Sequence, residues 1–374
     1  MTSLISPGTR PRYTPTGHIV YGGGDGTLRA VTFDADRLEV TGTPTVLIDG
    51  VLTLATGATG FAVAANGSLA YAAGNAAARR LVWVDRAGRE ELVETAPMMF
   101  DHPRLSPDGR RVAVRVDEAG NSDLHIVDLD RGTVVLLTRG PDLDTSPVWS
   151  PDGTAILFGS TREGGGVFKI AADGTGAIER LAESVTGSVP LTHAWSRKGE
   201  IMFYEARGPT LANIYLLAPE SSSVAPLLAL PDIRQAHPAL SPDGRFLAYT
   251  GNESGRSEIY VRPFPNVGDG RELISPAGGE EPLWSPDGTE LFYWDIATRS
   301  MMAVPVTLEP GFRAGAATRL FGGNYLFPQA GRHYDVTSDG QRFLMVKPEA
   351  GGNEAQIILV QNWFEELKRL VPVP

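Results

Sequence analysis

The sequence of 374 residues contains no cysteine. Disulfide bonds, cysteine zinc sites and thiolate nucleophiles are therefore excluded, although the compartment stays open because large domains outside the cytoplasm can also lack cysteine. Apolar runs are short, and none approaches the roughly 18 residues of a membrane-spanning helix. The N-terminal stretch MTSLISPGTRPRY lacks the basic start and apolar core of a signal peptide. We therefore expect no direct insertion of this chain into a membrane.

Positive charge is scarce and scattered along the chain. The sequence has 33 Lys and Arg against 44 Asp and Glu, a formal net charge of −11, and it shows no basic stripe. Proteins that bind nucleic acid normally carry such a stripe to contact the phosphates. The sequence therefore argues against a nucleic-acid partner.

The motifs of several enzyme classes are also missing. The chain has no glycine-rich phosphate loop followed by its lysine, no HRD-type catalytic loop and no DFG, so it contains no kinase domain. It has neither the G-x-S-x-G turn of serine hydrolases nor the HExxH pair of zinc proteases. The prediction is a protein without catalytic residues of these classes and without a cofactor.

The tetrapeptide SPDG occurs four times, at 106–109, 150–153, 241–244 and 285–288. Pro sets φ at the second position of a tight turn, Asp bonds to nearby backbone, and Gly accepts a positive φ. Each copy is followed by an apolar run typical of a β-strand. A recurring turn of this kind indicates an architecture rather than a single site.

Weaker copies of the turn extend the series over the whole chain. The anchoring glycines are Gly17, Gly67, Gly109, Gly153, Gly199, Gly244, Gly288 and Gly340. Successive glycines are 42 to 52 residues apart. A period of that length made of short strands indicates a propeller or a solenoid. Residues 245–274, with the strand that leads to the next SPDG, predict about four antiparallel strands per unit.

These patterns predict an all-β fold, a single β-propeller over residues 1–374 with four-stranded antiparallel blades. Eight anchors favour eight blades, and seven or six are the alternatives. Residues 1–6 are expected to close the ring as an outer strand, which would leave no exposed sheet edge; the alternative is a disordered N-terminus. Only residues 362–370 look helical, with Asn362 as a possible cap and a face of Trp363, Phe364, Leu367 and Leu370.

The repeat resembles the WD40-like PD40 repeat of TolB-type β-propellers, most clearly around the four SPDG turns. Three stretches also resemble the C-terminal propeller of bacterial receptor-like serine/threonine kinases: TGHIVYGGGDGTLRAVTFDADRLEVTG, NESGRSEIYVRPFP and ILVQNWFEELKRL. The resemblance implies a sensor or interaction module, outside the cytoplasm and part of a longer or anchored protein. It implies little about the ligand, since propellers serve many functions.

One column of the repeat carries polar side chains. Seven residues before the turn glycines stand Arg10, Gly60, His102, Ser146, Thr192, His237, Glu281 and His333. Because equivalent positions of a propeller converge on its axis, we expect several of these side chains near one mouth of the central channel. The candidate ligand-binding residues are Arg10, His102, Arg104, His193, His237, Glu281 and His333.

Two interpretations of this column stay open. The side chains could bind a small ligand, an anion or a metal ion, since imidazole and carboxylate groups suit Zn or Mn. Alternatively, they form hydrogen bonds to neighbouring backbone and stabilise the start of the innermost strands. The histidines fall in different repeats, which disfavours three of them reaching one ion, so no residue is assigned as a metal ligand.

The sequence predicts a non-catalytic, monomeric propeller that binds a protein partner or a small ligand at the channel mouth. The alternative functions are a metal-dependent lyase or hydrolase that uses channel His and Glu residues, and a purely structural scaffold. In the loop GGNYLFPQAGRH, Tyr325 and Phe327 are expected to tuck onto the rim, with a recognition loop as the alternative.

Overall fold

The computed structural model describes residues 8–23, 25–53, 59–74, 78–118, 121–208, 211–218, 223–327, 330–349 and 356–373. The chain divides into two compact units. Unit 1 comprises Met1–Ala78, Asp117–Asn121 and Glu349–Pro374, and unit 2 comprises Arg79–Val116 and Ser122–Pro348. Across the described ranges, no helix is long and apolar enough to cross a membrane.

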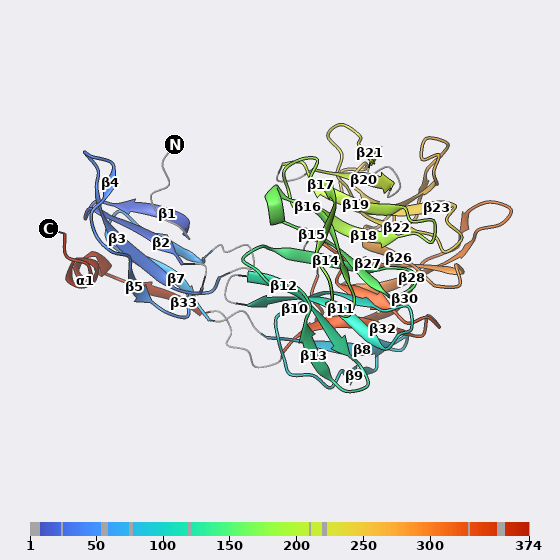
Figure 1. Ribbon diagram of the computed structural model, residues 1–374, viewed down its shortest axis with the longest axis horizontal. Coiled ribbons are helices and arrows are strands. Elements are labelled where there is room, and N and C mark those ends of the chain that lie inside the picture. Colours follow the sequence, from blue (N-terminus) through green and yellow to red (C-terminus); the bar gives the residue numbers. More distant parts are fainter. Residues whose placement is uncertain are drawn as a thin grey trace. The chain divides into compact units, whose positions relative to one another are not determined.

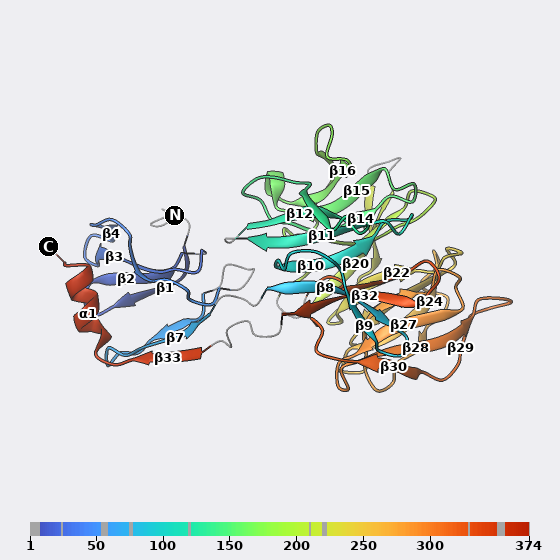
Figure 2. The ribbon, with the colours of Figure 1, turned by 90° about the horizontal axis from the view of Figure 1, so that it is seen from below.

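Unit 2 is built from antiparallel sheets, which we call blades 1 to 6 (Figures 1 and 2). Blade 1 contains β10 (Phe100–Leu105), β11 (Arg111–Glu118), β12 (Asn121–Asp128) and β13 (Thr133–Leu136). Blade 2 contains β14 (Asp144–Trp149), β15 (Ala155–Ser160), β16 (Gly166–Ala171) and β17 (Glu179–Glu183), with a 3-10 turn at Arg162–Gly164. Blade 3 contains β18 (Leu191–Trp195), β19 (Ile201–Ala206), β20 (Ala212–Ala218) and β21 (Ser223–Leu228).

The remaining blades follow the same plan. Blade 4 contains β22 (Gln235–Leu240), β23 (Phe246–Gly251), β24 (Glu258–Pro263) and β25 (Glu272–Leu273). Blade 5 contains β26 (Glu280–Trp284), β27 (Glu290–Asp295), β28 (Ser300–Thr307), β29 (Arg313–Ala314) and β30 (Thr318–Gly322). Blade 6 joins β31 (Tyr334–Val336) and β32 (Arg342–Pro348) to β8 (Arg79–Asp85) and β9 (Glu90–Leu92).

The six blades close into a ring. Their innermost strands contact one another in the order β31, β10, β14, β18, β22 and β26. The Tyr334 hydroxyl of blade 6 donates a 2.7 Å hydrogen bond to the Glu281 carbonyl of blade 5. One buried hydrophobic cluster lies between each pair of neighbouring blades, so the core is itself a ring. This confirms the all-β propeller class.

The SPDG turns repeat in structure as well as in sequence. Gly109, Gly153, Gly244 and Gly288 all have φ between 70° and 72°. In each turn the serine hydroxyl donates to the aspartate carboxylate, and the glycine N–H donates to the serine carbonyl. The residues four positions before these glycines are apolar and belong to the clusters between blades: Leu105, Trp149, Leu240 and Trp284. The Trp149 and Trp284 indoles donate to the Arg104 and Ala239 carbonyls of the preceding blade.

Unit 1 has its own sheets and core. One sheet contains β1 (Thr9–Thr14), β2 (His18–Gly22), β3 (Leu28–Asp34), β4 (Glu39–Val40) and β5 (Thr45–Ile48). A second contains β33 (Gln356–Val360), β7 (Leu69–Ala73) and β6 (Phe61–Val63). The helix α1 (Trp363–Leu370) follows β33 (Figure 2). Its Trp363 and Leu367 pack against Val20, Leu28 and Leu69.

The structure differs from the expectation of one ring with eight blades over residues 1–374. The turns at Gly17 and Gly67 belong to unit 1, and the described residues of unit 2 form six blades. A turn with flanking strands is the same local signal in a blade and in a separate sheet, so the glycine spacing does not distinguish them. The ring is closed by β8 and β9, whereas residues 1–6 lie outside the described residues.

The expected C-terminal helix is present as α1, although Asn362 makes no side-chain cap and Leu370 is exposed. The loop aromatics Tyr325 and Phe327 do tuck inward. Tyr325 is buried and donates to Glu90, and the Phe327 ring stacks on Trp294 with centroids 3.9 Å apart.

Candidate functional site

The polar column lies on a bulge in the innermost strands. His102, Ser146, His237 and Glu281 each have φ between 49° and 56° and each precedes a proline. The pairing register between the first and second strands shifts at the same point. A bulge redirects a side chain, and a left-handed residue other than glycine persists only where its surroundings hold it. Here the surroundings are the packed interior of the ring.

Six of the seven candidate residues lie in this interior. His102 and Arg104 are in β10, His193 in β18, His237 in β22 and Glu281 in β26, and His333 directly precedes β31. All six are at most 3% exposed. They therefore lie buried along the innermost strands, whereas the repeat pattern predicts several of them near a channel mouth. Arg10 is an exposed residue of β1 in unit 1, outside the six blades.

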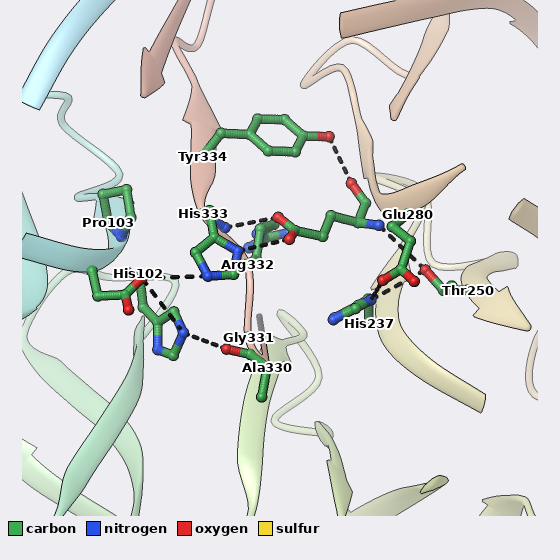
Figure 3. A network of polar contacts seen from close by, with 12 residues as sticks. His102, Pro103, His237, Thr250, Glu280, Ala330, Gly331, Arg332, His333 and Tyr334 are labelled. Carbon is green, nitrogen blue, oxygen red and sulfur yellow. Dashed lines mark hydrogen bonds and ion pairs between the residues drawn. The ribbon is translucent and has the colours of Figure 1, made fainter. Parts of the chain in front are cut away.

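His333 bridges three blades at the centre (Figure 3). Its Nδ1 lies 2.7 Å from Oε1 of Glu281, and its backbone N–H donates to Oε2 of the same carboxylate at 2.8 Å. Its Nε2 lies 3.4 Å from Oδ1 of Asp101 in β10. Asp101 in turn accepts hydrogen bonds from Arg79 and Arg115. This arrangement ties blades 1, 5 and 6 together by charge.

The opposite charges of His333 and its two carboxylate neighbours shift the pKa values of His333 and Asp101 toward the charged forms. Burial by itself lowers the pKa of His333, but Glu281 and Asp101 outweigh it, so the pKa is raised above its ordinary value. Burial would raise the pKa of Asp101, yet the charges of His333 and the two arginines bring it well below its usual range. The geometry therefore favours an imidazolium between two carboxylates.

The segment from Ala330 to His333 crosses the interior of the ring. His102 Nε2 lies 2.6 Å from the Ala330 carbonyl, and the Gly331 N–H donates to the Tyr204 hydroxyl of β19 at 2.9 Å. The Arg332 carbonyl accepts from Arg104 Nη1 at 3.0 Å. Together with the contacts of His333, the segment touches blades 1, 3 and 5.

A second group of rings fills the opposite side of the interior. His193 lies 5.5 Å from His237 and 5.2 Å from Tyr204 between ring centroids. His237 contacts the Tyr204 hydroxyl through Nε2 and the Thr250 hydroxyl through Nδ1. Burial lowers the pKa of both histidines well below the ordinary value, with additional positive charge from nearby arginines. Both imidazoles are therefore neutral.

Asp101, His102 and His333 are close enough to be considered as metal ligands, with donor atoms within 4.8 Å of one another. Their hydrogen bonds assign them another role. His102 is neutral because burial lowers its pKa, so the nitrogen next to the Ala330 carbonyl carries the proton and donates it. The raised pKa of His333 also favours a protonated ring. The lone pair that the neutral His102 keeps, on Nδ1, lies 3.0 Å from the Thr145 hydroxyl, which can donate to it. Both nitrogens of His102 therefore already have hydrogen-bond partners.

A cavity of about 510 Å³ lies at the end of the innermost strands where the turns are found. Its walls include Val148, Trp195, Leu240 and Leu283, together with His193 and Arg332 from the interior. Residues of the turns after β18 and β22 line the same cavity. A cavity of this size is suited to a small molecule or to a side chain of a partner.

Comparison with known proteins identifies the fold family. The model of the PD40 repeat, the TolB beta propeller domain, matches residues 65–228. An uncharacterized protein of Agrobacterium fabrum is 32% identical over 216 residues, which cover 56% of this chain and 70% of that protein. The chain belongs to the TolB β-propeller family.

Two curated TolB proteins match a shorter part of this TolB-type propeller. The TolB homolog of Chlorobium luteolum is 29% identical over 163 residues, and the Tol-Pal system protein TolB of Wolinella succinogenes is 27% identical over 164 residues. Each match covers 42% of this chain, but only 35% and 38% of those relatives. A solved structure from Agrobacterium tumefaciens described as a TolB superposes with a TM-score of 0.57 at 18% identity, over 72% of this chain and 98% of that one.

Sequence reasoning missed three charged residues of this TolB-type propeller interior. Asp101, Glu280 and Arg332 are buried beside the candidate residues, and each stands eight positions before a turn glycine. The positions eight residues before the turn glycines, next to the column used for the prediction, therefore indicate these buried charges. Tyr204 was missed as well, and its position in a second strand offers no such sign.

Proposed function

We propose that this TolB-type propeller is a non-catalytic binding module whose partner is a protein, as part of a Tol–Pal type system. The name of the Wolinella relative supports this proposal, and because the chain spans only 38% of that relative the role is inferred and not transferred. A rigid ring with a preformed cavity loses little conformational entropy on binding.

The observation that carries the proposal is that the acid–base groups at the centre of the ring, His333, Glu281 and Asp101, are paired with one another. His333 is held between Glu281 and Asp101, and Asp101 accepts from two arginines. Acid–base catalysis needs a titratable group in contact with substrate and within hydrogen-bond reach of the proton that moves. The fully buried Glu281 and His333 offer no such contact, whereas the cavity offers a surface for binding.

The test is a calorimetric titration of the whole chain with Tol–Pal system proteins encoded in the same genome. Lys198 is an exposed residue that lines the cavity, so Lys198→Glu should weaken the complex by about tenfold, or about 1.4 kcal/mol. Arg110→Glu makes the same charge change at an exposed site away from the cavity and should leave affinity unchanged. Absence of binding to every one of these proteins would contradict the proposal.

The metal-dependent lyase or hydrolase has no observation in its favour beyond the proximity of Asp101, His102 and His333. Stoichiometric Zn, Mn or Ca in the purified protein, lost in His102→Ala, would restore it. The role of a receptor-kinase sensor, the monomeric state and a position outside the cytoplasm stay predictions.

A further inference from the structure

Two buried arginines of the propeller interior lack carboxylate partners. Arg104 is 3% exposed and Arg332 is 6% exposed. Among the described residues, no carboxylate oxygen lies within 4.0 Å of either guanidinium, in contrast to Arg79 and Arg115, which contact Asp101. Burying a charge without a counter-charge is costly, so such a site is expected to have an anion as its partner.

The donors of these side chains are also largely unused. Arg104 bonds through Nη1 to the Pro103 and Arg332 carbonyls, while its Nε and Nη2 have no partner within the described part of the chain. The same holds for Nε of Arg332 and Nε2 of His193, both buried atoms. Native proteins rarely leave buried donors unpaired, and each such group calls for an unseen partner.

The three residues lie together, because Arg104 Nη1 donates to the Arg332 carbonyl at 3.0 Å and Arg332 and His193 line the same cavity. Burial and the charge of Arg332 lower the pKa of Arg104 to about 9. Burial lowers the pKa of His193, and the charges of Arg332 and Arg104 lower it further. The nearby carboxylates are already used: Asp335 accepts from the Leu105 and Val336 N–H groups, and Glu281 accepts from His333.

The adjoining cavity indicates what kind of anion fits. Arg332 and His193 line it at one side, and Trp195, Leu240 and Leu283 supply apolar surface. Glu200 and Asp243 also line it, and each is bound to the serine of its own turn, Ser196 and Ser241. A polar cationic end with apolar walls favours an organic acid over inorganic phosphate.

We propose that Arg332 and His193, with Arg104 beside them, bind the carboxylate of an organic acid whose apolar body occupies the cavity. The guanidinium fork pairs with a carboxylate through two parallel hydrogen bonds, and His193 adds a third contact. This inference rests on the binding role proposed above and names its chemistry. The carboxylate is supplied either by a free small acid or by the C-terminus of a partner segment.

The experiment uses the full chain and measures binding by calorimetry. The probes are 4-methylpentanoate, its neutral amide, inorganic phosphate, and the peptide Ala-Ala-Ala-Leu with a free or amidated C-terminus. We expect the free acid to bind and its amide to bind at least about tenfold more weakly, since hydrogen bonds to a charged carboxylate are stronger than those to a neutral amide. Tighter binding of the free-acid peptide identifies a partner segment as the source, and tighter binding of 4-methylpentanoate identifies a small acid.

Variants separate the site from the fold. Arg332→Gln and Arg104→Gln should each reduce affinity for the acid at least about tenfold, and Arg110→Gln, at an exposed arginine, should not. Arg332→Lys keeps the charge without the fork and should bind with intermediate affinity. If Arg332→Gln does not fold, the comparison of acid with amide on the native chain still decides.

Equal binding of acid and amide, tighter binding of phosphate than of either carboxylate probe, no binding of either carboxylate, or unchanged affinity in Arg332→Gln overturns the inference. Tol–Pal proteins that bind while the carboxylates do not would leave the proposed function standing and remove this site. If the carboxylates bind and no Tol–Pal protein does, the carboxylate site stands and the proposed function is contradicted.

Discussion

At the scale of single residues, His333 is the group on which the centre of the ring depends. It is completely buried, and it contacts carboxylates of two other blades. Its raised pKa makes its protonation a source of stability. The contribution of its charge should be fully present below the ordinary histidine pKa of about 6.5 and should be lost as pH rises through the raised folded-state value.

Glu281→Gln should therefore destabilise the protein, by about 3 kcal/mol, because it leaves a buried imidazolium with one partner fewer. The difference in unfolding free energy from the native chain should be largest near pH 6 and should decrease toward pH 9. Urea denaturation at several pH values measures it. Glu91→Gln removes an exposed carboxylate and serves as the control. A difference that grows with pH would contradict the assignment of the charge.

Gly331 is required by the packing of His102. Its φ is +102°, and a Cβ at this position would overlap the His102 imidazole. Gly244 also has a positive φ but open space around it, so it measures the backbone cost alone. Gly331→Ala should lose about 1–3 kcal/mol more stability than Gly244→Ala, since overpacking adds to the backbone cost. Chemical denaturation of the two variants gives the comparison, and equal losses would show that the contact does not matter.

At the scale of elements, the SPDG turn is held by its serine hydroxyl. In the turn after β22, Ser241 Oγ donates to Asp243 and accepts from the Arg245 and Phe246 N–H groups. The turn after β18 has the sequence SRKG and no aspartate. There, within the described part of the chain, Ser196 Oγ makes hydrogen bonds only with Glu200, through its carboxylate and its N–H.

Ser241→Ala should therefore cost about 1–3 kcal/mol, because the part-buried Phe246 N–H loses its acceptor and the Arg245 N–H keeps only Asp243. Ser150→Ala and Ser285→Ala should cost similar amounts, since each hydroxyl donates to the turn aspartate and accepts from the N–H of the first residue of the next strand. Ser196→Ala should cost less. Thermal unfolding of the four variants checks the order. A larger loss of stability in Ser196→Ala than in the variants of the SPDG turns would contradict this role of the serine hydroxyl.

At the scale of the whole molecule, the chain has two compact units with separate hydrophobic clusters. The core of unit 1 depends on α1, where Leu367 is completely buried, and His18 contacts the Val371 carbonyl at 2.6 Å. Chains with separate cores often unfold in more than one transition.

Leu367→Ala should destabilise unit 1 by about 2–5 kcal/mol, the usual cost of a large cavity in a core. Differential scanning calorimetry should show one transition moving to lower temperature while the transition of the propeller stays in place. Leu370→Ala, at an exposed position of the same helix, is the matched control. One cooperative transition that shifts as a whole would show that the units do not unfold independently.

The sequence by itself determined the strands, the turns and the family, because these depend on local chemistry. SPDG forms the same turn wherever it occurs, and the period of the repeat predicts sheets that must pack on one another. The column that holds His102, His237, Glu281 and His333 was also visible, since a ring brings equivalent positions together.

Only the tertiary structure decided which turns belong to the ring and how the charges pair. Gly17 and Gly67 have local sequences like the other anchors, yet they belong to unit 1, and β8 and β9 complete blade 6. The pairing of His333 with Glu281 and Asp101 joins residues 52 and 232 positions apart (333 less 281, and 333 less 101). Such contacts depend on the closure of the ring, and no local pattern encodes which carboxylate an imidazole will meet there.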